Sequence, residues 1–164
     1  MIRMGSVALK DKESIMNYIC ESVAKTIEET LVDLYPYGST PQHTLSRIDD
    51  DGDSGYFHKV YLVRSLLERE LNIYVCSHDD PNNWSIRIDY GVDVEPVFAE
   101  VGYRIIYDES KETLRVLPRS FSFSTEQTYR DGHYNREAFN DLIRIVNDLN
   151  ELIKEFQVGG NEDD

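Results

Sequence analysis

The sequence has few cysteines, no long apolar run and no excess of positive charge, and each shortage excludes a class of protein. Cys20 and Cys76 are the only two cysteines, and no CxxC spacing occurs, which excludes a disulfide-rich secreted scaffold. We expect two reduced thiols, although a bridge between them stays open. The longest apolar stretches, such as Val60 to Val63, fall far below the ~20 residues needed to cross a bilayer, so we expect no membrane span.

The N-terminus also lacks the features of a secretory signal. Arg3 and Lys10 supply positive charge, but no apolar segment separates them from Asp11 and Glu13. We therefore expect a cytoplasmic protein.

Positive charge is scarce. The chain has 17 basic and 31 acidic residues and a formal net charge of -14. A field of this sign repels phosphate backbones and anionic lipid surfaces and speeds the encounter with basic proteins. The charge disfavours direct binding to nucleic acid or to a membrane and favours a basic protein partner, unless the acids serve only solubility.

Motifs of catalysis and cofactor binding are missing as well. No GxSxG, P-loop or GxGxxG is present, and the four histidines lack the spacing of a metal site. We expect no cofactor and favour a non-catalytic protein over an enzyme. A site assembled from distant residues, such as His78 with Asp79 or Asp80, remains an alternative.

Apolar periodicity predicts three helices. Residues 11–34 and the segment from Asn135, a plausible N-cap, to Phe156 carry apolar residues at helical spacing. A broad apolar side from Phe57 to Leu71 predicts another helix between them.

Alternating residues predict strands. The alternating runs are 72–77, 84–90, 101–107 and a return strand from Thr113, with a bend at Pro118. We expect an α+β fold with an antiparallel sheet of four to five strands, and two N-terminal helices and one long C-terminal helix on one face. Residues 1–158 form one domain in this interpretation, and residues 159–164 form a disordered acidic tail.

The segment 36–56 shows neither helical nor strand periodicity. It holds two prolines, three glycines and four aspartates, and we expect a long polar loop, which in a compact domain is usually functional or disordered. Asp49, Asp51 and Asp53 have the spacing of the first ligands of an EF-hand loop. Ser54 replaces the required glycine and Val60 the bidentate glutamate, so calcium is only a weak alternative.

Two groups of acids are candidate contacts for a basic partner. One is Asp49, Asp50, Asp51 and Asp53 in the predicted loop, and the other is Asp141, Asp148, Glu151 and Glu155, expected on the exposed side of the last helix. The helix group has about half the charge density of a DNA strand. A DNA mimic would need the loop or a second subunit beside it, and a homodimer stays open.

Arginines form a third candidate group. Arg87, Arg104, Arg115 and Arg119 are expected on the outward side of neighbouring strands, where they could bind a small anion or a nucleotide. Cross-strand pairing with Asp89, Glu100 and Asp108 is the alternative.

The leading hypothesis is a non-catalytic acidic protein that inhibits or sequesters a basic protein, with nucleic-acid-binding proteins among the candidate partners, as immunity proteins, nuclease inhibitors and phage anti-defence proteins do. The alternatives are an anion-binding or nucleotide-binding module on the arginine face, and a metal-dependent hydrolase or calcium-binding domain.

Overall fold

The computed structural model describes residues 2–4, 7–34, 40–50, 53–64, 67–77, 82–92, 97–125 and 136–159. Side chains are described at residues 2–4, 8–34, 71–76, 82–90, 100–122 and 139–159. Residues 160–164, the main part of the predicted tail, and Asn135, the predicted helix cap, lie outside these ranges.

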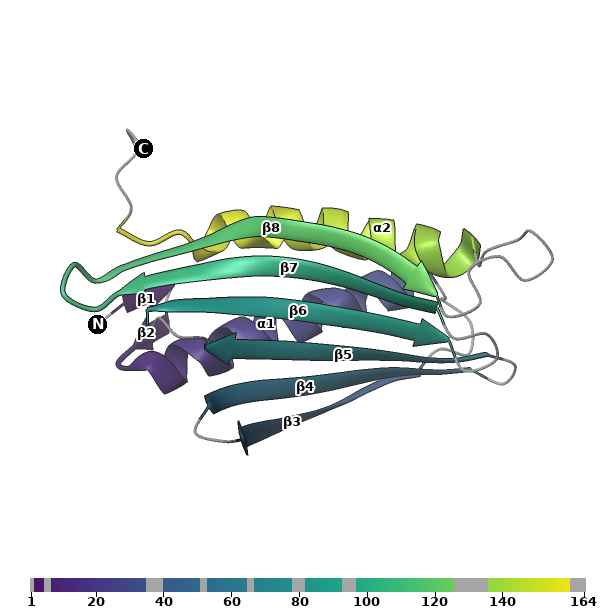
Figure 1. Ribbon diagram of the computed structural model, residues 1–164, viewed down its shortest axis with the longest axis horizontal. Coiled ribbons are helices and arrows are strands. Elements are labelled where there is room, and N and C mark those ends of the chain that lie inside the picture. Colours follow the sequence, from purple (N-terminus) through teal and green to yellow (C-terminus); the bar gives the residue numbers. More distant parts are fainter. Residues whose placement is uncertain are drawn as a thin grey trace.

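Two long helices and a six-stranded antiparallel sheet make up the described fold (Figure 1). The helices are α1 (Lys12–Leu34) and α2 (Arg136–Ile153), and a short 3-10 turn, η1 (Lys154–Phe156), continues α2. The strands of the sheet are β3 (Thr40–Asp50), β4 (Asp53–Arg64), β5 (Leu67–Ser77), β6 (Asn83–Val92), β7 (Val97–Asp108) and β8 (Thr113–Thr125). Each strand pairs with the next along the chain, and β1 (Ile2–Met4) and β2 (Val7–Leu9) form a separate small hairpin.

Helix α1 begins at an aspartate cap. The backbone N–H of Ser14 donates to Asp11 Oδ1 at 2.8 Å, which satisfies one of the unpaired donors at a helix start. This bond to the Ser14 backbone is the main reason that the pKa of Asp11 is lowered. Beyond the cap, apolar residues at positions 15, 19, 23, 27 and 31 are fully buried, so one side of α1 faces the sheet.

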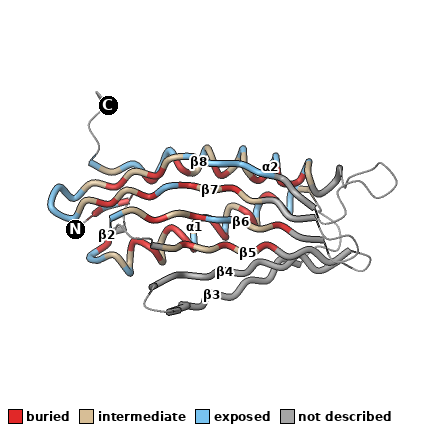
Figure 2. Tube along the Cα trace, viewed as in Figure 1, coloured by how far each residue is buried: buried red, intermediate tan, exposed pale blue. Residues whose placement is uncertain are grey.

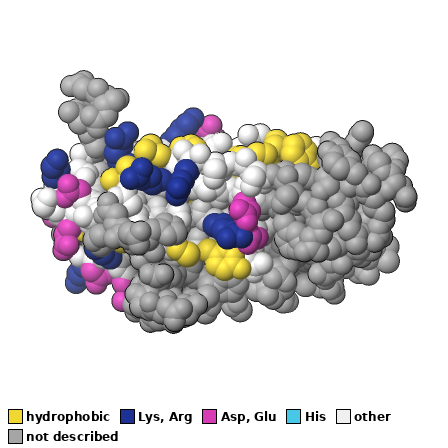
Figure 3. Space-filling model, in the orientation of Figure 1, with side chains coloured by type: hydrophobic (Ala, Val, Ile, Leu, Met, Phe, Trp, Pro, Cys, Tyr) yellow, Lys and Arg dark blue, Asp and Glu magenta, His cyan; other side chains and the backbone are white. Residues whose placement is uncertain are grey.

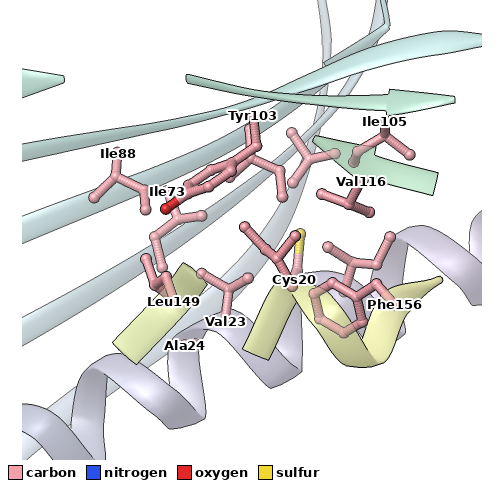
Figure 4. Close-up of a cluster of buried hydrophobic side chains, with 14 of the residues drawn as sticks. Cys20, Val23, Ala24, Ile73, Ile88, Tyr103, Ile105, Val116, Leu149 and Phe156 are labelled. Carbon is pink, nitrogen blue, oxygen red and sulfur yellow. The ribbon is translucent and has the colours of Figure 1, made fainter. Parts of the chain in front are cut away.

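Both helices pack on the same face of the sheet. Helix α1 contacts β3, β4 and β5, helix α2 contacts β6, β7 and β8, and the two helices contact each other. Figure 4 shows Cys20 and Val23 of α1 and Leu149 of α2 among the side chains of Ile73 and Tyr103 from the sheet. Every second residue of the central strands is buried against the helices (Figure 2).

The prediction of an α+β fold with an antiparallel sheet is confirmed, and so are the first and last helices and the hairpin of strand 101–107 with a return strand from Thr113. The predicted helix 57–71 is wrong, since these residues belong to β4 and β5. The predicted loop 36–56 is also wrong where it is described, because β3 pairs with β4 from Thr40↔Val63 to Asp50↔Asp53. The described fold thus has two long helices rather than three, and six strands in its main sheet.

Both errors have a physical cause. Residues 57–63 are mostly aromatic or β-branched, which favours a strand when the partners lie on both sides, and β4 pairs with both β3 and β5. The dipeptide Asp51-Gly52, between the last residue of β3 and the first of β4, is a strong signal for a two-residue hairpin turn. No helix in the described part of the chain is long and apolar enough to cross a membrane.

Candidate functional site: the outer face of the sheet

The face of the sheet that points away from the helices carries three of the four predicted arginines, namely Arg87, Arg104 and Arg115. Cross-strand register places Ser85 beside Arg104 and Arg104 beside Leu117, and the next row places Ile106 beside Arg115. Arg87 lies on the same side of β6, opposite Gly102. We call this side the outer face, and it is the side seen in Figure 3, where several Lys and Arg side chains are visible.

The fourth arginine, Arg119, lies at an irregularity in the pairing of β7 with β8. Gly102 pairs with Ser120 and Tyr103 with Pro118, so Arg119 is an extra residue in β8. Such a bulge puts two successive side chains on one side of the strand and increases the local twist. The bulge therefore directs Arg119 to the outer face beside Ser120.

Gly102 makes room for this bulge. A Cβ atom at position 102 would lie 2.6 Å from Ser120 Oγ, which is closer than non-bonded atoms approach. The Ser120 hydroxyl therefore lies in the space that a side chain at position 102 would take.

A hollow of about 570 Å³ lies next to the bulge. Its described lining residues are Asn83, Trp84, Arg104, Leu117, Pro118 and Arg119. We call it the arginine hollow. Two guanidinium groups and an amide provide polar contacts, Leu117 and Pro118 provide apolar surface, and no carboxylate belongs to the described lining.

The amide of Asn83 holds Arg104 in place. Arg104 Nε donates to Asn83 Oδ1 at 2.9 Å, so this arginine is oriented by a neutral amide, and no ion pair to it occurs among the described side chains. Arg119 is exposed, and no hydrogen bond or ion pair to it occurs within the described part of the chain.

Arg87, in contrast, is neutralised. Its Nε donates to Asp89 Oδ1 at 3.0 Å, its Nη2 contacts a carboxylate oxygen of Glu100, and its guanidinium lies 5.9 Å from the centre of the Tyr74 ring. The hydrogen bond that Arg87 donates to Asp89 is the main reason that the pKa of Arg87 is raised. The predicted alternative of a cross-strand ion pair is therefore confirmed for Arg87 with Glu100, whereas Asp89 lies on the same strand as Arg87. Asp108 instead accepts hydrogen bonds from Ser110 and from the Lys111 backbone, and its pKa is lowered, chiefly by the Ser110 hydroxyl.

The acids predicted on the exposed side of α2 are not one surface. Asp141 is 5% exposed and accepts a hydrogen bond from the Tyr90 hydroxyl at 2.7 Å. Asp148 accepts one from the Thr30 hydroxyl at 2.6 Å and also contacts Arg144. Placing Asp141 on the solvent side was wrong, because α2 packs against α1 as well as the sheet and so buries a wider arc than its apolar stripe.

Of the remaining predicted acids, the structure describes the side chains on α2 and η1 but not those of the β3–β4 hairpin. Glu151 pairs with Lys154 at 3.0 Å and is exposed, as is Glu155. Asp49, Asp50 and Asp53 lie at the ends of β3 and β4 where these strands join, but their side chains and Asp51 lie outside the described residues. The weak calcium alternative at Asp49, Asp51 and Asp53 is therefore untested.

Sequence reasoning missed the neighbours that make the arginine hollow. Asn83 precedes the alternating run 84–90 of the sequence, but it is the first residue of β6. A clue to the bulge was present, since Pro118 is confined to edges or bulges within sheets, and the predicted bend there is a pairing shift.

The exposed side of α1 was also not predicted as a surface. Two neighbouring hollows of about 390 Å³ and 510 Å³ run along it and share Lys25 and Glu28. Their other described lining residues are Tyr18, Glu21, Ser22, Glu29, Val32 and Asp33.

Among the described residues, no group of histidine, cysteine, aspartate and glutamate side chains has the arrangement of a metal site. No protein-family model, curated protein or solved structure matches this chain.

Proposed function

We propose that this protein is a non-catalytic binding protein that holds an anionic ligand on the outer face of its sheet. The observation that carries the proposal is the arginine hollow, where Arg104 and Arg119 lie beside Asn83 without a described carboxylate in the lining. Guanidinium groups bind carboxylates and phosphates in a planar, two-pronged geometry.

The contrast with the rest of the molecule supports this proposal. Acidic residues outnumber basic ones by 31 to 17, and two of the described arginines, Arg87 and Arg144, each contact two carboxylates. Arg144, for example, contacts Asp33 at 2.9 Å and Asp148 at 3.4 Å. A site with two arginines and a neutral hydrogen-bonding partner is thus unlike its surroundings, which is typical of a surface that receives negative charge from outside.

Thermal unfolding with and without anions tests the proposal. A ligand that binds only the folded state raises the melting temperature with its concentration. We expect stabilisation by at least one member of a panel of phosphates and small carboxylates, and its loss in Arg104→Gln. Arg144→Gln is the matched control, because it removes the same charge from α2 on the other side of the sheet. A panel without any stabilising anion would overturn the proposal.

A second candidate function is the binding of a basic protein. The hollows along α1 favour it, because Val32, which is 47% exposed, lines one hollow together with Glu29 and Asp33, and Glu21 lines the neighbouring hollow. A cationic segment with an apolar residue would complement this side. An inhibitor of a basic protein, as an immunity or anti-defence protein is, would use such a surface.

Charge reversal on α1 tests the second candidate. Capture of basic proteins from the native cell should weaken with added salt, and Glu21→Lys with Glu29→Lys should slow the association. Lysines in place of Asp49 and Asp50 test the hairpin acids, which remain a prediction. Capture that is unchanged by every reversal would remove this candidate.

A further inference from the structure

The charge and the walls of the arginine hollow narrow the class of ligand, provided that the outer face binds an anion as proposed above. Two arginines line the hollow, and a carboxylate would neutralise only one of them. A phosphate monoester carries a charge of about -1.5 to -2 at neutral pH and offers three strong acceptor oxygens. The pair of guanidinium groups therefore fits a terminal phosphate better than a single carboxylate.

The size of the hollow sets the size of the molecule that bears the phosphate. Its volume of about 570 Å³ lies within the ~300–1,000 Å³ range of small-molecule sites. An inorganic phosphate would leave most of this space open. The ligand should therefore have a body of mononucleotide size attached to its anionic group.

The lining predicts the nature of that body. Leu117 and Pro118 provide apolar surface beside the arginines, and Asn83 offers an amide. Flat apolar surface and a few polar groups suit a ring with hydrogen-bonding edges. A hydrophilic chain such as a polyol would gain little from Leu117 and Pro118.

The field of the whole protein excludes a polymer. A chain with a net charge of -14 repels a polyanion beyond the hollow, and this repulsion grows with each added phosphate within about a Debye length of ~10 Å. A ligand with a single phosphate group can contact the arginines while little of its charge is repelled by the acidic surface.

We propose that the arginine hollow binds a small phosphate monoester with a ring-containing body, of the size of a mononucleotide, through Arg104 and Arg119. Asn83 orients Arg104, as their 2.9 Å hydrogen bond shows. The bulge at Arg119 brings the second guanidinium to the same hollow.

Isothermal titration of the full chain with matched probes tests this inference. The probes are adenosine monophosphate, adenosine, ribose 5-phosphate, inorganic phosphate, citrate and a short single-stranded oligonucleotide. We expect adenosine monophosphate to bind about tenfold or more tightly than adenosine, since each charge-assisted hydrogen bond contributes at this scale. Ribose 5-phosphate and inorganic phosphate should bind with lower affinity than adenosine monophosphate, in that order. The oligonucleotide should bind more weakly per site than adenosine monophosphate.

Variants then locate the binding. Arg104→Gln and Arg119→Gln should each weaken the binding of adenosine monophosphate by about tenfold to a hundredfold, while Arg144→Gln should leave it within about twofold. Arg119→Lys keeps the charge but loses the planar fork, so its affinity should fall between those of the wild type and Arg119→Gln. Circular dichroism of each variant confirms that it folds.

The outcomes separate this inference from the proposed function. Citrate as the only ligand would overturn the phosphate inference and leave anion binding in place. Equal affinities for adenosine and adenosine monophosphate would overturn the role of the arginines. If no anionic probe binds, both proposals fall, and the same holds if Arg144→Gln weakens binding as much as Arg104→Gln.

Discussion

Gly102 is the residue at which β7 changes its pairing with β8, and its missing side chain has a measurable consequence. In Gly102→Ala the new Cβ would meet Ser120 Oγ at 2.6 Å but Ser120 Cβ at 3.8 Å. Only the hydroxyl obstructs the alanine, and it can rotate away, so the loss of unfolding free energy should be modest, about 1 kcal/mol.

A double variant isolates this clash. Ser120→Ala removes the obstructing oxygen and keeps the carbon at ordinary contact distance, so Gly102→Ala with Ser120→Ala should recover the stability that Gly102→Ala loses. Urea denaturation of the two single variants and the double variant measures the coupling. Purely additive effects would show that the contact between residues 102 and 120 does not set the local structure.

Cys20 supplies a second prediction for a single residue. Its thiol is fully buried between α1 and the sheet, and burial is the main cause that raises its pKa from 9.0 to about 12. The thiolate is the reactive form, so Cys20 of the folded protein should resist alkylation at pH 8 and react at the normal rate in denaturant. Mass spectrometry of the alkylated protein distinguishes it from Cys76, which is half-buried and should react first. Prompt modification of Cys20 in the folded state would contradict the packing in Figure 4.

The sign of the pH effect follows from the same shift. The folded-state pKa of Cys20 exceeds its unfolded value, so its contribution to stability is complete below pH 9.0 and declines as the pH rises towards about 12. Cys20→Ser should lose this alkaline dependence, although the buried hydroxyl lowers stability at every pH.

At the scale of elements, the exposed edge of β8 is closed by the segment that follows α2. Leu114 and Val158 exchange two backbone hydrogen bonds of 2.9 Å. The side chain of Gln157 makes the hydrogen bonds that a neighbouring strand would make to Val116. Its amide oxygen accepts from the Val116 N–H at 3.2 Å, and its amide N–H donates to the Val116 C=O at 2.9 Å. The next edge position, Pro118, has no N–H to offer, so this half of the edge resists pairing with another chain.

Gln157→Ala should therefore do two things. It removes both hydrogen bonds to Val116, so we expect a loss of about 1–3 kcal/mol in unfolding free energy. It also uncovers a strand edge, so we expect more self-association at high concentration. Denaturant unfolding and sedimentation velocity measure the two effects. Lys154→Ala is the control, since it removes only an exposed ion pair with Glu151; equal effects of the two substitutions would contradict the role of Gln157.

The elements also show what the sequence could predict. Helix α1 and the strands from β6 onward were predictable because each has one apolar side and one polar side. Strand β4 was not predictable from the sequence, because it lies between two strands and its apolar residues fit the spacing of a helix as well as that of a strand. The buried position of Asp141 depends on Tyr90, which is 51 positions away in the sequence, and no local pattern encodes that contact.

At the scale of the whole molecule, both helices cover one face of the sheet, and no helix of the described part of the chain lies on the other face. The sequence predicted helices on one face and arginines on the other, since strand alternation separates the two sides. It could not predict which arginines are neutralised. Arg87 meets Asp89 on its own strand and Glu100 on the next, whereas Arg104 meets Asn83, and the contacts between strands depend on the register of β6 against β7.

The net charge of -14 makes the stability of the whole protein depend on salt, and this dependence can be separated from binding. Sodium chloride screens the repulsion among the excess carboxylates, so the melting temperature should rise by several degrees between low and moderate salt. Variants Arg119→Gln and Arg144→Gln should both keep this rise, because each changes the net charge by one.

Phosphate at the same ionic strength should stabilise the wild type further, since binding to the folded state adds to screening. The additional rise in melting temperature in phosphate over chloride should disappear in Arg119→Gln and persist in Arg144→Gln. The general effect of phosphate on apolar surface acts on the wild type and both variants alike. Melting curves in matched salts measure the difference. An excess that is the same in Arg119→Gln as in the wild type would assign the phosphate effect to the solvent and leave the arginine hollow without a ligand.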